Sequence, residues 1–246
     1  MKNIVLISTF NGQKYVEKQI DSIFSCLSKF PVVIYWYDDG STDGTVDLLT
    51  SYNDSRIIRI TKNGKCSVAK NFLHLLKIAV DREGHENIFY FADQDDIWSS
   101  EKIVNTEKYL ENKCGLLLSS TITFGGVGEK IVPNINRPFF LDITFNISPG
   151  MSYAFRATSV NKLLDFSNNF EWHDHSVFIF FKYIEKQIHI DKSVNQFYRR
   201  HMEALTLDYK RGLFSRMIYA LNNLKSFLLW KINYRLNLND VQNKYC

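Results

Sequence analysis

The 246-residue sequence has few cysteines and none of the spacings that would organise a fold around them. Cys26, Cys66, Cys114 and Cys246 form neither a CxxC pair nor a Cys/His ligand pattern. We therefore expect unpaired thiols, which excludes a disulfide framework and a zinc site. Internal repeats and low-complexity linkers are also absent from the sequence, so we expect one large domain with at most a small appendage.

Long apolar runs are missing as well. No stretch approaches the ~20 apolar residues that span a bilayer, and residues 1–8 have neither the apolar length nor the cleavage site of a signal peptide. The net charge of +4 is too small to indicate a nucleic-acid partner. We expect a cytoplasmic protein whose contact with a membrane is at most peripheral.

The two common phosphate-binding loops are missing too. The first apolar segment ends in Ser8-Thr9-Phe10-Asn11-Gly12, which contains neither GxGxxG nor GxxxxGKS/T. This excludes a Rossmann dinucleotide site and a P-loop. A bound diphosphate would have to be neutralised by a metal ion and by side chains.

Apolar segments are present in a regular order. Hydrophobic residues make up 45% of the chain and aromatic residues 15%, enough for a substantial core. Short apolar runs alternate with segments of helical spacing, which predicts an α/β fold with a mainly parallel sheet, helices on both faces and ligands at the carboxyl ends of strands. The expected strands are 4–9, 32–37, 56–61, 87–92, 116–123 and 188–198; the expected helices are 15–27, 45–52, 67–80, 160–166 and 176–184. We also expect a turn at 125–128 and a loop that runs into a strand over 148–156.

Carboxylates gather where the strand at 87–92 ends. Asp93, Asp95 and Asp96 lie within four residues, so their charges repel and lose hydration together. A hard cation with oxygen ligands, Mg²⁺ or Mn²⁺, would relieve this repulsion and could bind a diphosphate. The alternative is an acidic turn in which Asp96 or Ser99 caps a helix that begins near residue 101.

A second acidic segment, Asp38-Asp39-Gly40-Ser41-Thr42-Asp43-Gly44-Thr45, follows the strand at 32–37. A carboxylate here can accept the imide N–H of a pyrimidine base, and the glycines allow the backbone to approach a nucleoside closely. The alternative is a turn that caps the helix at Thr45.

Residues 208–236 have apolar residues at helical spacing, and after Asp208 every charged residue among them is Lys or Arg. This pattern predicts either a basic amphipathic helix on an anionic membrane surface or a helix that packs on its own domain or on a partner subunit.

Four motifs occur in order: residues 8–12, residues 38–45, Asn63-Gly64 with Ala69-Lys70-Asn71, and residues 93–96. Together they resemble the nucleotide-binding half of the family 2 glycosyltransferases, which have the GT-A fold. The motif at residues 91–98, Phe91-Ala92-Asp93-Gln94-Asp95-Asp96-Ile97-Trp98, is most similar to the corresponding motif of the bacterial rhamnosyltransferase-like branch. The resemblance covers residues 3–201. It implies a GT-A domain at 1–205, with a nucleotide-sugar half (1–100) and an acceptor half (101–205). The pattern of apolar and basic residues predicts that a C-terminal amphipathic helical segment follows at 206–246.

The resemblance assigns roles in the donor half. Thr9 and Phe10 would line the base pocket, and Asp39 with Asp38 would hold uracil or thymine and the ribose. Asp95 would hold Mg²⁺ or Mn²⁺, with Asp93 facing the ribose and Asp96 near the donor sugar. Lys70 stands where arginine is usual, which keeps the charge but loses the bidentate fork. The complete expected donor set is Thr9, Phe10, Asn11, Asp38, Asp39, Lys70, Asp93, Gln94, Asp96, Arg199 and Arg200.

In the acceptor half, Glu171-Trp172-His173-Asp174-His175 resembles the acidic motif at the start of the acceptor-side helix, so Asp174 would be the general base. The alternative is a helix cap beside two satisfied histidines. Gly150, Met151, Trp172 and His173 would line the acceptor site.

Tyr198-Arg199-Arg200-His201 resembles the segment that closes over the diphosphate, with His201 as a second metal ligand. Residues 202–205 depart from the glycine and asparagines that usually follow, and the alternative is a basic strand end.

The resemblance implies an inverting, metal-dependent transferase that moves a sugar from a dTDP- or UDP-sugar, with dTDP-rhamnose as the best candidate, to a glycan or lipid-linked glycan. The expected setting is bacterial surface polysaccharide or O-antigen assembly at the inner face of the membrane. UDP-glucose, UDP-galactose and their N-acetyl forms are alternative donors. A sugar-phosphate nucleotidyltransferase would need a glycine-rich basic loop that residues 8–14 lack, and a non-catalytic binding module is the third alternative.

Overall fold

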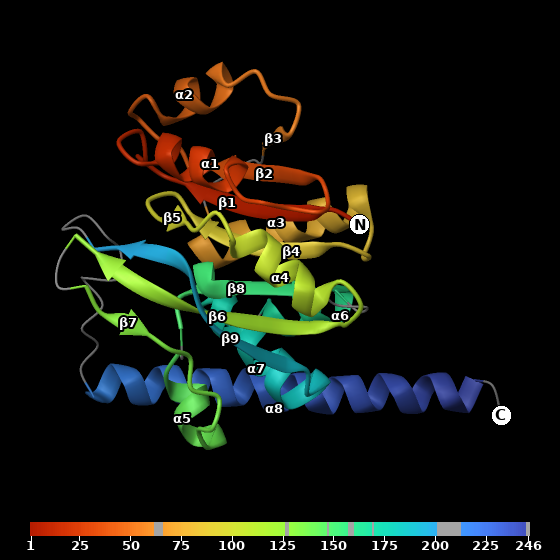
Figure 1. Ribbon diagram of the computed structural model, residues 1–246. Coiled ribbons are helices and arrows are strands. Elements are labelled where there is room, and N and C mark those ends of the chain that lie inside the picture. The colour runs from red at the N-terminus through yellow and green to blue at the C-terminus, as the bar shows by residue number, and fades with distance from the viewer. Residues whose placement is uncertain are drawn as a thin grey trace.

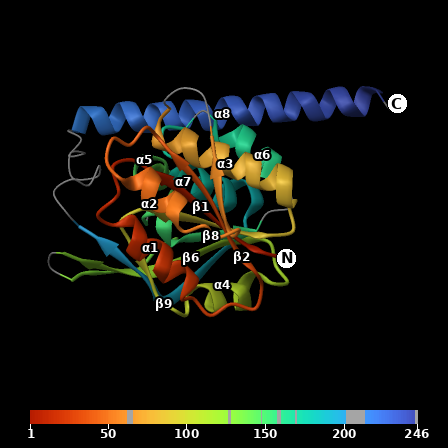
Figure 2. The same ribbon diagram turned by 90° about the horizontal axis from the view of Figure 1, so that it is seen from above.

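The computed structural model describes residues 1–61, 66–125, 128–146, 148–156, 160–168, 170–200 and 213–244. Within them, a nine-stranded sheet runs through the molecule and helices cover both of its faces (Figures 1 and 2). The Asn63-Gly64 pair and His201, both part of the predicted motifs, lie outside these residues, as do residues 126–127 of the predicted turn.

One half of the sheet has four parallel strands in the spatial order β3-β2-β1-β4. Helices cover these strands on both sides, which explains why their sequences are almost continuously apolar. The elements are β1 (Asn3–Thr9), α1 (Val16–Phe24), β2 (Val32–Asp38), α2 (Thr45–Ser51), β3 (Ile57–Ile60), α3 (Val68–Glu83) and β4 (Ile88–Asp93). All seven elements predicted for this half are confirmed, with ends that shift by a few residues.

The other half of the sheet mixes strand directions. β8 (Tyr153–Arg156) pairs antiparallel with both β4 and β6 (Gly115–Phe124), whereas β9 (Ile188–Arg199) runs parallel to β6. Two short antiparallel strands complete it: β5 (Ile97–Trp98) beside β9 and β7 (Lys130–Ile131) beside β6. The sequence pattern does not predict these two strands, because two residues carry no measurable periodicity.

The helices of the second half are α4 (Lys102–Leu110), α5 (Phe139–Thr144), α6 (Val160–Ser167) and α7 (His173–Phe180), with a 3₁₀ turn η1 (Gly150–Ser152) and a π-helical turn η2 (Phe181–Glu185). The helix predicted at 176–184 therefore begins at His173 and changes character at Phe181. The alternative in which Asp96 or Ser99 caps α4 is met only by Ser99: its Oγ accepts from Glu101 N at 3.3 Å, whereas Glu101, the N-cap residue, makes no side-chain cap of its own.

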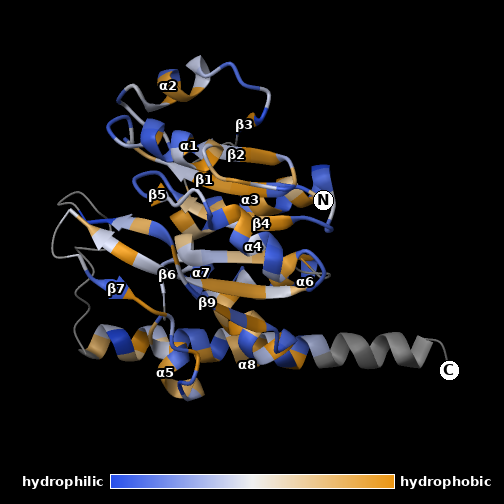
Figure 3. Cartoon of the chain, viewed as in Figure 1, coloured by the Kyte–Doolittle hydropathy of each residue, from blue (hydrophilic) through white to orange (hydrophobic). Residues whose placement is uncertain are grey.

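Alternate residues of the strands point into two separate cores, as the pleat requires. Ile4 and Leu6 face a core shared with α3, α6 and α7, whereas Val5 and Ile7 face a core shared with α1, α2 and α4. Hydropathy colouring shows the same apolar strands between more polar outer helix surfaces (Figure 3). The sheet edge at the strand ends is therefore carried on a rigid, doubly covered layer.

The last helix, α8 (Leu213–Lys244), lies along one side of the molecule (Figures 1 and 2). Phe227 packs against Phe139 of α5 and Phe166 of α6, and Trp230 donates from Nε1 to Asp165 Oδ2 at 2.9 Å. One side of α8 therefore packs on its own domain, as one of the two interpretations of residues 208–236 predicts. Throughout the described chain, every helix is too short or too polar to cross a membrane.

Candidate active site

The carboxyl ends of β1, β2 and β4 meet at one edge of the sheet. In the parallel register, Thr9 lies opposite Asp38 and Ser8 lies opposite Asp93. Because β1 lies between β2 and β4, the two acidic segments flank the loop that follows Thr9. This is the position at which parallel sheets bind ligands.

The two acids of the Asp38-Asp39 pair have different surroundings. Asp38 Oδ1 accepts from the backbone N–H groups of Gly40 and Ser41 at 3.0 and 2.8 Å, while Oδ2 accepts from the Thr9 hydroxyl at 2.9 Å and from the Ser41 hydroxyl. Both oxygens of Asp38 thus hold the loop. Among the described residues, Asp39 accepts a long 3.4 Å bond from the Tyr37 hydroxyl, so we expect Asp39 to be the carboxylate that meets a ligand.

Gln94 fastens the loop after β4 to the loop after β1. Its side-chain amide accepts from Phe10 N and donates to Phe10 O, both at 2.9 Å. A Cβ on Gly12 would lie 2.2 Å from Gln94 Oε1, so only glycine leaves room for this clamp. The Gln94 amide, predicted to contact the donor, is used to hold the backbone of Phe10, whose side chain is 50% exposed.

Asn11 also ties two loops together. It adopts a left-handed conformation (φ 47°), donates from its backbone N to Ser41 Oγ at 2.8 Å and accepts from Thr42 N at its Oδ1 at 2.8 Å. Its predicted contact with the donor would therefore be indirect, through the shape of the two loops.

Acids from the two halves of the chain come together at this edge. Burial, and then the charges of Asp95 and Asp174, raise the pKa of Asp93 to about 7. Asp93 and Asp95 are only partly buried by neighbouring atoms, so solvent still reaches both acids. The structure thereby brings the predicted base beside the predicted metal-binding segment.

Asp174 lies in the first turn of α7 and is held by residues of two segments, one of which is fixed in turn by β8. Its Oδ1 accepts from His175 N at 2.7 Å and its Oδ2 accepts from Asn146 Nδ2 at 2.6 Å. Asn146 Oδ1 in turn accepts from the Tyr153 hydroxyl at 2.9 Å. Burial raises the pKa of Asp174 to about 6, which leaves it ionised at neutral pH and still basic enough to accept a proton.

Two of the predicted acceptor residues, Gly150 and His173, lie close to Asp174. A Cβ on Gly150 would lie 2.9 Å from Asp174 Cβ and 3.3 Å from His173 Nε2, so the 3₁₀ turn approaches α7 closely because residue 150 is glycine. His173 is buried and stacks on Phe72 with 4.2 Å between the two ring centroids, and burial lowers the pKa of His173 to about 3. His173 is thus a neutral core side chain, while Trp172 is partly exposed at the N-cap of α7.

Asp96, unlike Asp93 and Asp95, does not face solvent. It is fully buried, and its Oδ1 accepts from Arg199 N at 2.9 Å, which joins the acidic segment to the end of β9. Burial and the charges of Asp93 and Asp95 raise the Asp96 pKa well above its usual value. The prediction that Asp96 contacts the donor sugar does not agree with this burial, because the side chain points into the protein.

The three cations predicted to bind a diphosphate differ in their contacts and in their exposure to solvent. Arg199 donates from Nε to Asp95 O at 2.7 Å and lies over the rings of Tyr15 and Phe124, so its guanidinium stabilises the acidic loop. Arg200 is 3.8 Å from Glu129 and about half exposed, and Lys70 is exposed on the first turn of α3. Of the three, Lys70 and Arg200 have the exposure that a phosphate ligand requires.

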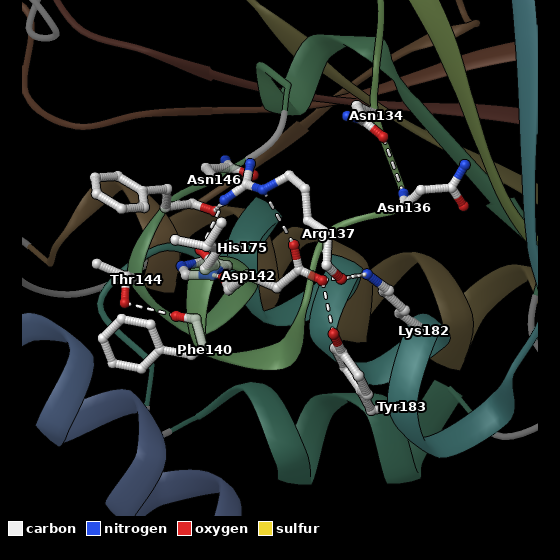
Figure 4. Close-up of polar contacts among 12 residues, drawn as sticks. Asn134, Asn136, Arg137, Phe140, Asp142, Thr144, Asn146, His175, Lys182 and Tyr183 are labelled. Atoms are coloured by element: carbon white, nitrogen blue, oxygen red, sulfur yellow. Dashed lines mark hydrogen bonds and ion pairs between the residues drawn. The ribbon is translucent and has the colours of Figure 1, made fainter.

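A buried ion cluster on α5, which the sequence does not predict, supports the acceptor side (Figure 4). Asp142 is fully buried; its Oδ2 accepts from the Lys182 ammonium and, at 2.7 Å, from the Tyr183 hydroxyl, and its Oδ1 lies 3.4 Å from Arg137 Nε. His175 Nε2 hydrogen-bonds the backbone oxygen of Asp142. The cluster therefore fixes the start of α7, and with it Asp174.

Lys102 is a second buried group that sequence reasoning misses. Its ammonium donates to Met151 O at 2.9 Å and to Gln196 Oε1 at 2.6 Å, beneath the predicted floor of the acceptor site. Burial lowers the pKa of Lys102 to about 7. Met151 is itself fully buried, so it supports that floor from within instead of touching an acceptor.

In the part of the chain that the structure describes, no three His, Cys, Asp or Glu side chains are grouped closely enough to hold a metal ion by themselves. The described cysteines Cys26, Cys66 and Cys114 are free thiols, as expected.

Comparison with known proteins agrees with this architecture. Residues 4–202 match the sequence profile of Glycosyl transferase family 2. The dTDP-rhamnosyl transferase RfbG of Shigella flexneri is 29% identical over 209 residues, covering 79% of this chain and 71% of RfbG. WfaP of Escherichia coli, a UDP-Glc:alpha-D-GlcNAc-diphosphoundecaprenol beta-1,3-glucosyltransferase, is 34% identical over 110 residues, covering 44% of this chain and 41% of WfaP.

Among solved structures, residues 1–349 of S. aureus TarS have a similar fold. The complex with UDP-GlcNAc has a TM-score of 0.65 at 17% identity, covering 90% of this chain and 66% of TarS 1–349. The complex with UDP has a TM-score of 0.61 at 19% identity, covering 81% and 61%. The chain thus spans less than two thirds of these TarS structures. The expected α/β GT-A-type fold is confirmed, and since the family profile matches most of the chain, the protein belongs to glycosyl transferase family 2 and is a glycosyltransferase.

Proposed function

We propose that the protein transfers a sugar from a nucleoside diphosphate with a pyrimidine base to a glycan acceptor, with inversion at the anomeric carbon. The observation that carries this proposal is the proximity of Asp174, from the acceptor half, to Asp93 at the ends of β1 and β4. A donor diphosphate beside the acidic segment and an acceptor hydroxyl beside Asp174 would lie on opposite sides of the anomeric carbon.

In the proposed reaction, Asp174 takes the proton of the acceptor hydroxyl while that oxygen forms a bond to the anomeric carbon. The bond from this carbon to the diphosphate oxygen breaks on the opposite face, and the nucleoside diphosphate leaves with the electron pair. A single displacement inverts the carbon. Asn146 and the His175 backbone N–H hold the two oxygens of Asp174 in place, which keeps the base oriented toward the acceptor.

The donor we favour is dTDP-rhamnose, which as a β-L-donor would give an α-L-rhamnoside. The similarity to RfbG along most of the chain supports this choice, and the shorter match to WfaP supports UDP-glucose as the alternative. The proposed setting is the assembly of bacterial surface polysaccharide such as O-antigen, with a glycan or a lipid-linked glycan as acceptor.

A divalent cation, Mg²⁺ or Mn²⁺, fits the acidic segment if the diphosphate supplies part of its ligands. Mutual repulsion among Asp93, Asp95 and Asp174 contributes to the raised pKa of Asp93, and a cation would relieve it. Mg²⁺ in proteins commonly takes only one or two carboxylates and completes its shell with phosphate oxygens and water, so a three-residue cluster is not required. We propose that Asp95 holds the ion with Asp93 beside it; the proposed contribution of His201 lies outside the described residues. When bound, the ion would offset the negative charge of the diphosphate.

A donor screen tests this function. The protein is incubated with Mn²⁺ and a panel of dTDP-, UDP- and GDP-sugars, and donor hydrolysis and binding are measured. We expect dTDP-rhamnose to be preferred and GDP-sugars to be inactive, because in this proposal Asp39 accepts the imide N–H of thymine or uracil. Preference for GDP-sugars would contradict the pyrimidine site. Equal turnover in EDTA would contradict the metal, and so would equal turnover by Asp95→Asn.

A further inference from the structure

Helix α8 has apolar residues on two opposite sides. The inner side is buried against the domain through Tyr219, Asn223, Phe227 and Trp230. The other side has seven large apolar side chains that are each 45–75% exposed; we call them the outer stripe. Its members are Phe214, Met217, Ile218, Leu221, Leu228, Leu229 and Ile232.

The packing of α8 on the domain does not use the outer stripe. The inner side is fixed by Trp230 to Asp165, by Asn223 Nδ2 to Ile143 O at 3.1 Å and by the Tyr219 hydroxyl to His175 Nδ1. A helix that only covers a core exposes polar residues on its far side. A contiguous exposed apolar surface instead marks an interaction site, so the outer stripe requires a partner outside the domain.

Charge identifies the chemistry of that partner. Lys225 lies within the outer stripe, since it is three or four residues from Leu221 and Leu228. Arg216 and Lys231 lie on the same helix but over the rings of Phe145 and Phe227, toward the domain. Between residues 213 and 239 the sequence contains no Asp or Glu. The surface is therefore apolar and only basic, without a carboxylate of its own to neutralise it.

A second copy of the chain suits this surface poorly. The positions 214, 218, 221, 225, 228 and 232 have the alternating spacing of four and three residues that a helix pair requires. Pairing two outer stripes would nevertheless bring Lys225 close to the cations of the other copy without a carboxylate between them. An anionic lipid surface offers both missing components: phosphate charge for the cations, and acyl chains for the apolar residues.

We propose that the outer stripe of α8 binds an anionic phospholipid membrane, with the helix lying in the plane of the headgroups. Helix α5 packs beside α8 and adds Phe140, which is 70% exposed, and Leu141. The same two helices hold His175, through the Tyr219 hydroxyl and the Asp142 backbone oxygen, next to Asp174. The acceptor side of the site would thus be the side carried on the membrane-bound helix. This inference does not depend on the proposed donor or metal.

The test is co-sedimentation of the full chain with vesicles of phosphatidylcholine, with or without phosphatidylglycerol. We expect binding only to the vesicles with phosphatidylglycerol. Leu221→Gln combined with Leu228→Gln should weaken this binding by about tenfold or more. Lys225→Gln should weaken it by about fivefold, because one basic side chain at an anionic surface contributes about that factor. The matched control is Leu27→Gln with Tyr109→Gln. It removes two exposed apolar side chains on the opposite face of the sheet, one from the loop after α1 and one from α4. This control should bind like the unaltered protein.

Three outcomes overturn the proposal. Binding of the unaltered protein that ignores phosphatidylglycerol would remove the charge argument, and unchanged binding by the double variant would remove the outer stripe from the contact. A dimer in light scattering that the double variant dissociates, without vesicle binding, would identify a second copy as the partner. Donor hydrolysis without vesicles should be unchanged in all variants, so a failed donor screen and a failed vesicle assay can be told apart.

Discussion

On the donor side of the site, the loops after β1, β2 and β4 hold one another through short polar side chains that lie within the motifs themselves, as Asp38 and Gln94 do. On the acceptor side, Asp174 depends on Asn146, on His175 and, behind them, on the buried Asp142 cluster of α5 and η2. The donor side is thus a set of partly exposed loops, and on the acceptor side the proposed base is held in place by a buried ionic cluster. Substitutions should accordingly impair donor binding on one side and the stability of the fold on the other.

The largest expected effect is that of removing the base. Asp174→Asn keeps the side-chain shape and one of the two accepted hydrogen bonds, from Asn146 Nδ2 or from His175 N, but it cannot take a proton. We expect kcat to fall by about 10²–10⁴-fold, while the melting temperature falls only by the amount that one lost hydrogen bond explains. Full activity of this variant would remove Asp174 from the mechanism.

The next effect concerns the framework behind the base. Asp142→Asn leaves the Lys182 ammonium and Arg137 without their buried counter-charge, and breaking such a pair costs about 3–5 kcal/mol of unfolding free energy. Denaturant unfolding measures it. The matched control, Lys77→Met, breaks the exposed Lys77–Asp81 pair one turn apart on α3 and should cost less than about 0.5 kcal/mol. Equal losses in both variants would mean that the buried cluster is not a framework.

On the donor side, removing a charge should stabilise the fold. The folded-state pKa of Asp93, about 7, lies above its usual value of 3.8, so its ionisation costs stability as the pH rises from about 4 to 7. Each pKa unit corresponds to about 1.4 kcal/mol, and because solvent reaches part of the side chain we expect Asp93→Asn to gain roughly 1–2 kcal/mol at pH 8 in EDTA. The gain should disappear near pH 4 while donor binding is lost at every pH. A destabilised variant at pH 8 would contradict the repulsion.

The smallest expected effect is a shift in pH dependence. If Asp174 is the base, as we propose, it must be ionised to act, and kcat/KM should fall about tenfold per pH unit below its pKa of about 6. Asn146→Ala removes a hydrogen bond that favours the charged carboxylate, so the acidic limb should move to higher pH by up to about one unit. An acidic limb at the same pH in both proteins would argue that another group limits the rate.

The sequence predicts the donor side far better than the acceptor side, for a physical reason. Each donor motif follows a buried apolar strand directly, and parallel strands bring their carboxyl ends to one edge, so spacing alone places Thr9, Asp38 and Asp93 together. The Asp142 cluster joins Asp142 to Lys182 and Tyr183, which lie 40 and 41 positions later in the sequence, on short helices without a distinctive period. Nothing local indicates which charges meet there.

Asp96 shows the same limit within a well-predicted motif. Solvent reaches its neighbours Asp93 and Asp95, but the Asp96 side chain is turned inward by its hydrogen bond with Arg199 N, 103 residues later. A run of acids in a sequence therefore predicts a site without showing which member faces it. Helix α8 is similar: its spacing predicts an amphipathic helix, and only packing separates the side that is buried from the side that is exposed.

The Gln94 clamp has a consequence for the energetics of ligand binding. It extends hydrogen bonding between β1 and β4 beyond the last residue of each strand, in both directions. We therefore expect the loop proposed to cover the nucleobase and the loop that carries Asp95 to move together. Ordering either loop would then lower the entropy cost of ordering the other. Base and cation should therefore bind with positive cooperativity: Mn²⁺ would tighten the binding of the free nucleoside, which has no phosphate to touch the ion, and Gln94→Leu would abolish that effect.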